Sequence, residues 1–288
     1  VDPVGGSGST WRIYEGRTTP LLTPLLTPVS VAMASDAVSV VYTGQNQTNA
    51  AGVTTRLIVN GNDADRGRIF GTAVNSCSGG VASCTNAGTY TVTATADLFS
   101  DQLGYDLIVR NPLSASLTIT PAPVTVTYTA NAASGVYGSA PGLLSGTTSA
   151  TGFLNSDTIA SSVSGSASWN TAATSTSGVG SYAITGSGLS GNNGNYAFTF
   201  SQGAGNASAF TVTPRPISVA ANTATSVYGA ALPLFTFAVG GQGLVNGDVL
   251  GGSLQSGATT TSGIGDYAIT LGSLANPNYL ISRSEERR

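Results

Sequence analysis

Few side chains in this sequence could do chemistry, and histidine, the commonest general base, is missing altogether. Without histidine, a Ser/His/Asp triad and a histidine-based metal site are both excluded. Charged residues make up only 8% of the 288 residues, against roughly 25% in an average soluble protein. We therefore expect a protein that is not an enzyme and that has no catalytic residue and no cofactor.

The two cysteines, Cys77 and Cys84, are separated by small or turn-forming residues. Such a loop closes easily, so in an oxidising compartment the pair is expected to form a disulfide, and the alternative is two free thiols. Zinc binding is not expected, because two cysteines without histidine supply too few soft ligands.

Acidic residues recur at one matched position of the chain. Asp157 follows Asn155 by two residues, and Asp248 follows Asn246 in the same way. Asp and Asn side chains commonly accept hydrogen bonds from nearby backbone N–H groups. We predict that Asp157 and Asp248 cap turns.

Two weaker candidates for ligand binding remain. Asp63 and Asp65 have the alternate spacing of a calcium loop, but Val74 stands where an EF-hand needs glutamate. We therefore predict a solvated turn there and no metal site. Trp11 and Trp169 could stack on sugars if they are exposed, and packing in the core or at a sheet edge is the alternative.

The charge distribution and the lengths of the apolar stretches argue against two classes of partner, nucleic acid and membrane. The net charge is −3, and the basic residues form no stripe that could neutralise a phosphate backbone. No apolar stretch approaches the roughly 20 residues that span a bilayer. We expect neither nucleic-acid binding nor membrane insertion.

The elements that must position these residues belong to an internal repeat. Four markers follow one another three times: a strand that begins at proline, a tyrosine near a glycine, a Gly-x-Tyr strand and a second tyrosine strand. The copies begin at Pro28-Val-Ser-Val, Pro123-Val-Thr-Val and Pro216-Ile-Ser-Val. The tyrosines of the second and fourth markers are Tyr42 and Tyr105, Tyr137 and Tyr196, and Tyr228 and Tyr279.

The segments between the turns alternate with a period of two residues. Val124, Val126 and Tyr128 alternate with threonines, as do Tyr90 and Val92. One apolar face and one hydroxyl face are typical of a half-buried strand. The repeated tyrosines keep step with the apolar residues, so they are expected to point inward.

We predict an all-β fold, β-grasp-like, with at most one short helix per domain. The best helix candidates are residues 143–154 and 243–254. The predicted parts are an extended lead-in (1–28), a divergent β-domain with the cysteine loop (29–121), and two further β-domains (122–214 and 215–288). The prolines at 121, 123, 214 and 216 stiffen the junctions, which predicts three tandem domains in an elongated array.

The second and third repeats resemble the MBG (mostly beta-grasp) domain of filamentous-haemagglutinin-type bacterial exoproteins. The second has Tyr137-Gly138, Gly152-Phe-Leu-Asn-Ser-Asp157, Gly180-Ser-Tyr182, Asn195-Tyr196 and Phe210-Thr-Val-Thr-Pro214. The third has Tyr228-Gly229, Gly243-Leu-Val-Asn-Gly-Asp248, Gly265-Asp-Tyr267 and Asn278-Tyr279. The first repeat lacks the Asn-x-Asp turn. The lead-in strand Trp11–Tyr14 is similar to the segment that precedes such arrays.

The resemblance implies secretion by the two-partner or a related type V route, display at the bacterial surface, and a non-catalytic stalk or adhesin role. Partners would be other domains of the same exoprotein, or host or matrix glycans and proteins. A carbohydrate-binding module resting on the tryptophans is an alternative.

The third repeat departs from this pattern because no strand like Phe210–Thr213 follows Tyr279-Leu-Ile-Ser. Truncation or divergence would leave an open sheet edge. A strand donated by another copy of the chain, with the proline-rich lead-in as the candidate donor, would instead make a self-assembling fibre subunit.

Overall fold

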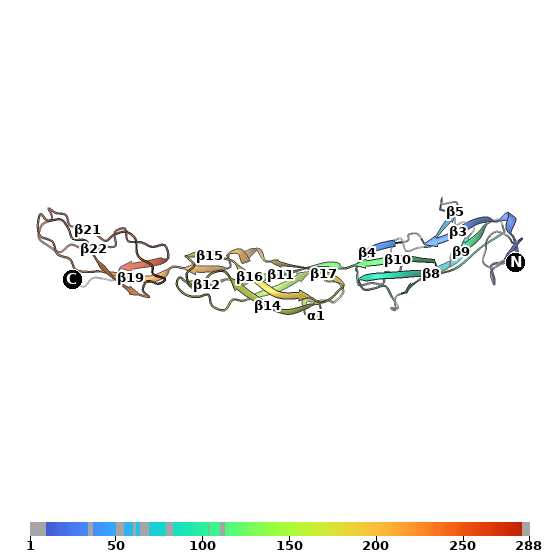
Figure 1. Ribbon diagram of the computed structural model, residues 1–288, viewed down its shortest axis with the longest axis horizontal. Coiled ribbons are helices and arrows are strands. Elements are labelled where there is room, and N and C mark those ends of the chain that lie inside the picture. The colour runs from blue at the N-terminus through green and yellow to red at the C-terminus, as the bar shows by residue number, and fades with distance from the viewer. Residues whose placement is uncertain are drawn as a thin grey trace. The chain divides into compact units, whose positions relative to one another are not determined.

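The computed structural model describes residues 10–33, 37–49, 55–59, 62–63, 69–78, 83–102, 104–109 and 113–283 (Figure 1). The chain is mostly β and divides into two compact units. Unit 1 comprises residues 1–125, 150–164 and 190–199, and unit 2 comprises residues 126–149, 165–189 and 200–288. None of the helices in the described ranges has the length and apolarity that crossing a membrane requires.

Unit 1 begins with a short antiparallel pair, β1 (Trp11–Arg12) and β2 (Leu21–Leu22). Two four-stranded sheets follow. The first has the order β6 (Asn62–Asp63), β5 (Thr55–Val59), β3 (Thr27–Met33), β9 (Tyr105–Val109). The second has the order β4 (Ala37–Val41), β10 (Leu113–Thr120), β8 (Gly88–Ser100), β7 (Ile69–Ser78). Its strands β4, β10 and β8 are labelled in Figure 1.

The second repeat contributes strands to both units. Its sheets have the orders β13 (Gly146–Thr151), β11 (Ala122–Ala130), β17 (Tyr196–Gln202); β12 (Ala133–Val136), β18 (Phe210–Thr213), β15 (Gly180–Tyr182); and β14 (Val163–Thr171) with β16 (Ile184–Gly191). Its helix α1 (Ile159–Ser162) is one turn long, and η3 (Ala204–Ser208) is a 3-10 helix.

The third repeat lies in unit 2 and has the fewest strands. One sheet has the order β20 (Phe237–Gly241), β19 (Arg215–Ala221), β23 (Tyr279–Arg283), and a two-residue pair joins β21 (Gln255–Ser256) to β22 (Ile269–Thr270).

The predicted alternation is confirmed in β11. Val124, Val126 and Tyr128 are buried, and the threonines between them face outward or are half-buried. Val92 in β8 is likewise buried. Removing these apolar side chains from water stabilises each sheet on its inner face, by about 25 cal/mol per Å².

In unit 2 one hydrophobic core is shared by the second and third repeats. One continuous cluster contains buried residues from both repeats: Tyr137, Ala173, Ile184, Ala209, Phe210, Val212, Ile217 and Tyr279. The third repeat also has a smaller cluster of its own, formed by Val219, Leu254, Ile269 and Leu274. The second and third repeats therefore share part of their core.

Neither of the two helix candidates contains a helix. Residues 146–151 form β13, because threonine is β-branched and favours a strand. Residues 243–254 contain turns and no helix, and three of their glycines have positive φ. The helix α1 lies later, where Thr158 and Ser161 form a reciprocal capping box.

The lead-in is more folded than the predicted extended segment. Its described residues form the β1–β2 pair and a 3-10 turn, η1 (Thr23–Leu25), which begins at the residue before Pro24. Leu21 and Leu26 are buried. Residues 1–9 of the lead-in lie outside the described ranges.

Candidate functional site

In unit 1 a tyrosine cluster lies where the first repeat meets the second. The rings of Tyr42 and Tyr196 meet edge to face, with centroids 5.5 Å apart, and both are buried. The Tyr196 hydroxyl donates a 2.6 Å hydrogen bond to Asp157 and accepts one from the backbone N–H of Leu154. Phe153 packs edge-on against the same Tyr196 ring.

Backbone contacts fix the register of this cluster. The Asn195 side-chain oxygen accepts from the N–H of Ala87, 2.8 Å away, and its backbone carbonyl accepts from the N–H of Ala122. Ala122 is the residue between the junction prolines, Pro121 and Pro123. The Asn-Tyr pair of the second repeat therefore contacts both the residue before the Gly-x-Tyr strand of the first repeat and the proline junction.

Unit 2 contains the same arrangement where the second repeat meets the third. Tyr137 and Tyr279 meet edge to face at 5.5 Å, and the Tyr279 hydroxyl donates to Asp248 at 2.8 Å and accepts from the Val245 N–H. The Asn278 side-chain oxygen accepts from the Val179 N–H at 3.0 Å. We call this arrangement of aromatic pair, aspartate and Asn-Tyr the tyrosine junction.

The unit 2 junction has additional bonds. The Tyr137 hydroxyl also donates to Asp248, at 2.8 Å. Arg215, at the position of Ala122, donates to the carbonyls of Gly243 and Gln242, and to that of Tyr137 at 3.4 Å. A guanidinium with several fixed donors suits the bridging of such carbonyls.

Two local features allow the repeats to approach this closely. Asn155 and Asn246 adopt left-handed φ angles of 56° and 59°, which asparagine tolerates better than most residues. The glycine after Tyr137 is equally constrained, because a Cβ on Gly138 would lie 2.6 Å from the Val245 side chain. The sequence motifs at both positions therefore fit the junction.

The junction perturbs its tyrosines. Burial, and next the hydrogen bond to Asp157, raise the pKa of Tyr196 to about 12. Burial also raises the pKa of Tyr279, helped by Asp248 and opposed by the Val245 amide. Both aspartates accept hydrogen bonds from the protonated phenol, and a phenolate beside a carboxylate would be repelled.

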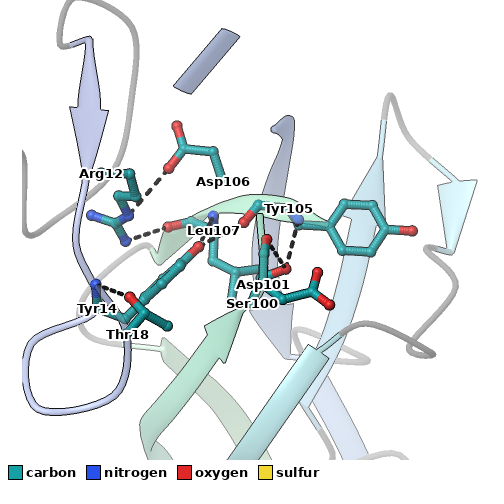
Figure 2. Close-up of polar contacts among 8 residues, drawn as sticks. All are labelled: Arg12, Tyr14, Thr18, Ser100, Asp101, Tyr105, Asp106 and Leu107. Carbon is teal, nitrogen blue, oxygen red and sulfur yellow. Dashed lines mark hydrogen bonds and ion pairs between the residues drawn. The ribbon is translucent and has the colours of Figure 1, made fainter. Parts of the chain in front are cut away.

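A second polar cluster attaches the lead-in to the first repeat (Figure 2). The buried Arg12 guanidinium forms an ion pair with the buried Asp106 carboxylate, Nε to Oδ1 at 3.2 Å, and donates to the Leu107 carbonyl. The Tyr14 hydroxyl donates to the Tyr105 carbonyl at 2.7 Å and accepts from the Leu107 N–H. Burial raises the pKa of Tyr14. These bonds all go to β9, so they fasten the lead-in to one strand.

The predicted site residues have separate positions. Cys77 and Cys84 form a disulfide, with Cα atoms 5.8 Å apart. The Asp157 and Asp248 carboxylates accept from tyrosine hydroxyls, a role that the sequence did not suggest. Trp11 is 43% exposed, whereas Trp169 is half-buried, edge-on to Tyr128. Asp65 lies outside the described residues.

Within the described residues, no group of three or more histidine, cysteine, aspartate or glutamate side chains could hold a metal. A shallow depression in the third repeat is lined by Val219, Leu254 and Ile269 among others, and it encloses no space that a water molecule could enter. Ligand pockets enclose roughly 300–1,000 Å³, so this depression is not a ligand pocket. The tyrosine junction is therefore the strongest candidate site, and its chemistry is recognition between repeats.

The junction motifs can be recognised in the sequence, but their partners cannot. The Asn-Tyr and Asn-x-Asp motifs contact each other within one repeat, and the tyrosine of the Asn-Tyr motif packs against the tyrosine of the second marker in the preceding repeat. The signal that could have revealed the contact between repeats was that the first repeat keeps Tyr42 but lacks the Asn-x-Asp turn.

The fold and the junction together define a tandem-repeat β-protein with specific contacts between successive repeats. Two segments, residues 126–204 and 217–286, match the family model of the MBG domain (YGX type) and together cover more than half of the chain. The chain belongs to this family, whose repeats are typical of bacterial surface proteins. No curated protein and no solved structure matches it.

Proposed function

We propose that this chain is a non-catalytic spacer segment of a secreted bacterial surface protein of the filamentous-haemagglutinin type. In this role the repeats hold a distal part of the protein away from the cell. This requires the array of repeats to be stiff. The chemistry of the chain fits an extracellular location, because disulfides persist in oxidising compartments and Cys77 and Cys84 form one.

The observation that carries the proposal is that the tyrosine junction occurs in each unit with the same contacts. In unit 1 it joins Tyr42, Tyr196, Asp157 and Asn195, and in unit 2 it joins Tyr137, Tyr279, Asp248 and Asn278. A flexible linker would need no such buried and hydrogen-bonded contact. Proline on both sides of Ala122 and Arg215 restricts the connecting backbone further.

Small-angle scattering of the full chain tests the spacer role. A single compact globule of this length would have a radius of gyration of about 20 Å, and an unfolded chain about 60 Å. We expect an intermediate value with the scattering profile of a stiff rod. A radius near that of the globule would contradict the proposal.

The contribution of the junction is tested by a matched pair of variants. Tyr137→Ala removes a buried ring from the unit 2 junction, whereas Tyr228→Ala removes the same side chain from a position where it is 72% exposed. We expect Tyr137→Ala to broaden the distribution of scattering distances and Tyr228→Ala to leave it unchanged. An equal effect of both would contradict the role of the junction.

Surface display is tested in cells that express the natural full-length protein. Protease added to intact cells should release fragments that contain this segment, and it should not cleave a cytoplasmic marker. Protection of the segment until the cells are lysed would contradict display at the surface.

A further inference from the structure

The third repeat differs from the first two at one strand position. In unit 2, β18 is the middle strand of its sheet, parallel to β12 and antiparallel to β15. In unit 1, β10 has the same place, parallel to β4 and antiparallel to β8. Each of these middle strands directly precedes a proline junction and the next repeat.

The third repeat keeps the two flanks of this sheet but not its centre. Ala224–Val227 corresponds to β12, and Gly265–Tyr267 corresponds to β15. The local bonds of both flanks recur: Tyr267 donates to Gly263 as Tyr182 does to Gly178, and Asn222 bonds Thr236 as Asn131 bonds Ser145. Neither flank is a strand in the structure, and no described residue of this repeat lies between them as β18 does.

The flanks expose apolar side chains that are less exposed at the matching positions of the second repeat. Tyr228 is 72% exposed, whereas its counterpart Tyr137 is only 4% exposed. Val227 and Ile264 are fully or mostly exposed, and Tyr267 is 43% exposed. In the second repeat the corresponding area is covered by the side chains of Phe210 and Val212 in β18, which are 2% and 5% exposed. The third repeat has no such pair among its described residues. Exposed apolar clusters of this kind mark interaction surfaces.

Matching backbone carbonyls of the second and third repeats accept hydrogen bonds from different donors. In the second repeat the Ser175 carbonyl accepts from the side chain of Asn246, which belongs to the following repeat. Its counterpart in the third repeat, the Thr260 carbonyl, accepts from the Gly229 N–H at 2.9 Å. The third repeat therefore satisfies internally a bond that a further repeat would otherwise supply.

We propose that the third repeat is a receptor for an extended segment of the Phe-Thr-Val-Thr-Pro type, which inserts between residues 224–227 and 265–267 as the middle strand of a sheet. The segment would bring with it a further MBG repeat, whose Asn-Tyr pair and aspartate dock on Tyr228. Backbone hydrogen bonds to both flanks would give affinity, and two apolar side chains on one face would give specificity. This inference goes beyond the spacer role, because the third repeat would bind such a strand whatever the array does.

The test is amide hydrogen exchange of the full chain with a peptide copying residues 208–216. We expect at least roughly tenfold slower exchange at residues 224–227 and 265–267. The control peptide carries Thr211→Pro, because proline cannot occupy the middle of a sheet. Equal protection by both peptides, or protection elsewhere in the chain only, would overturn the proposal.

A second arm supplies the strand within the chain. Residues 203–214 are copied after Arg283, which raises the effective concentration of the strand to about the millimolar range. We expect the same protected residues, and a matched chain carrying Thr211→Pro in the added copy should lack the protection. If the added strand leaves both flanks in fast exchange, the inference is wrong. This result would not affect the scattering test of the spacer role.

Discussion

The Tyr137 and Tyr279 rings meet edge to face, and both hydroxyls donate to the same carboxylate oxygen of Asp248. Tyr137 belongs to the second repeat and the other two residues to the third. An edge-to-face aromatic pair contributes roughly 0.5–1.5 kcal/mol beyond its buried area. Since the acceptor is charged, each hydroxyl bond is stronger than a neutral one. The contact therefore combines apolar burial with directional recognition.

Replacing the glycine beside this pair tests how closely the repeats approach. Gly138 and Gly229 have φ angles of 87° and 83°, so alanine strains the backbone similarly at both. Only at Gly138 would the new Cβ collide with a following repeat, at the Val245 side chain, because nothing lies within 4 Å at Gly229. We expect Gly138→Ala to lower the free energy of unfolding by about 1–3 kcal/mol more than Gly229→Ala. Urea denaturation of both variants measures the difference, and equal losses would contradict the contact.

Alkaline pH should weaken the unit 1 junction. The pKa of Tyr196 is about 12 in the folded chain and 10.0 in its ordinary state. Between these values the folded state holds the proton that the unfolded state has lost, so the Tyr196 contribution is complete below about pH 10 and is lost as the pH rises towards 12. Asp157→Asn removes the adjacent charge and should lower the pKa of Tyr196. Tyrosinate absorbance is measured against a Tyr196→Phe chain, and an unchanged titration in Asp157→Asn would contradict the assignment.

Removing Arg12 should destabilise the attachment of the lead-in. Arg12→Ala leaves the buried Asp106 carboxylate without its ion-pair partner, and such a loss typically costs about 3–5 kcal/mol. Arg17→Ala is the control, because Arg17 pairs with Asp97 between side chains that are 48% and 58% exposed, and exposed pairs contribute only about 0–1 kcal/mol. Denaturation midpoints and limited proteolysis near Tyr14 measure both variants. Similar losses of stability in the two variants would contradict a larger contribution from the buried Arg12–Asp106 pair.

Reducing the disulfide should destabilise the first repeat modestly. Cys77 and Cys84 are seven residues apart, and closing so short a loop restricts the unfolded chain by only about 2 kcal/mol. We expect the Cys77→Ser/Cys84→Ser chain to show this loss without reductant, and the parent chain to show it only with reductant. Mass spectrometry under non-reducing conditions checks the bond. A parent chain that carries two free thiols would contradict the structure.

Part of the candidate site could be predicted from the sequence, because its motifs are local. The Asn-Tyr, Asn-x-Asp and Tyr-Gly markers stand at matched positions, and the tyrosines in step with apolar residues were expected to be buried. Tyr137, Tyr196 and Tyr279 are buried, whereas Tyr228 and Tyr267 are exposed and correct that expectation. Alternation assigns a residue to a face of a sheet, but it does not say whether anything covers that face.

The sequence by itself determined that this chain forms strands with one apolar face, in repeats separated by turns, since alternation and turn residues act over a few neighbouring positions. Only the tertiary structure decided that Tyr137 packs against Tyr279 and that Arg12 pairs with Asp106. These partners are far apart along the chain, so their contact depends on the path of every strand between them. A local sequence pattern does not specify that path. In the folded chain, burial and hydrogen-bond geometry select one partner from many residues of the same type.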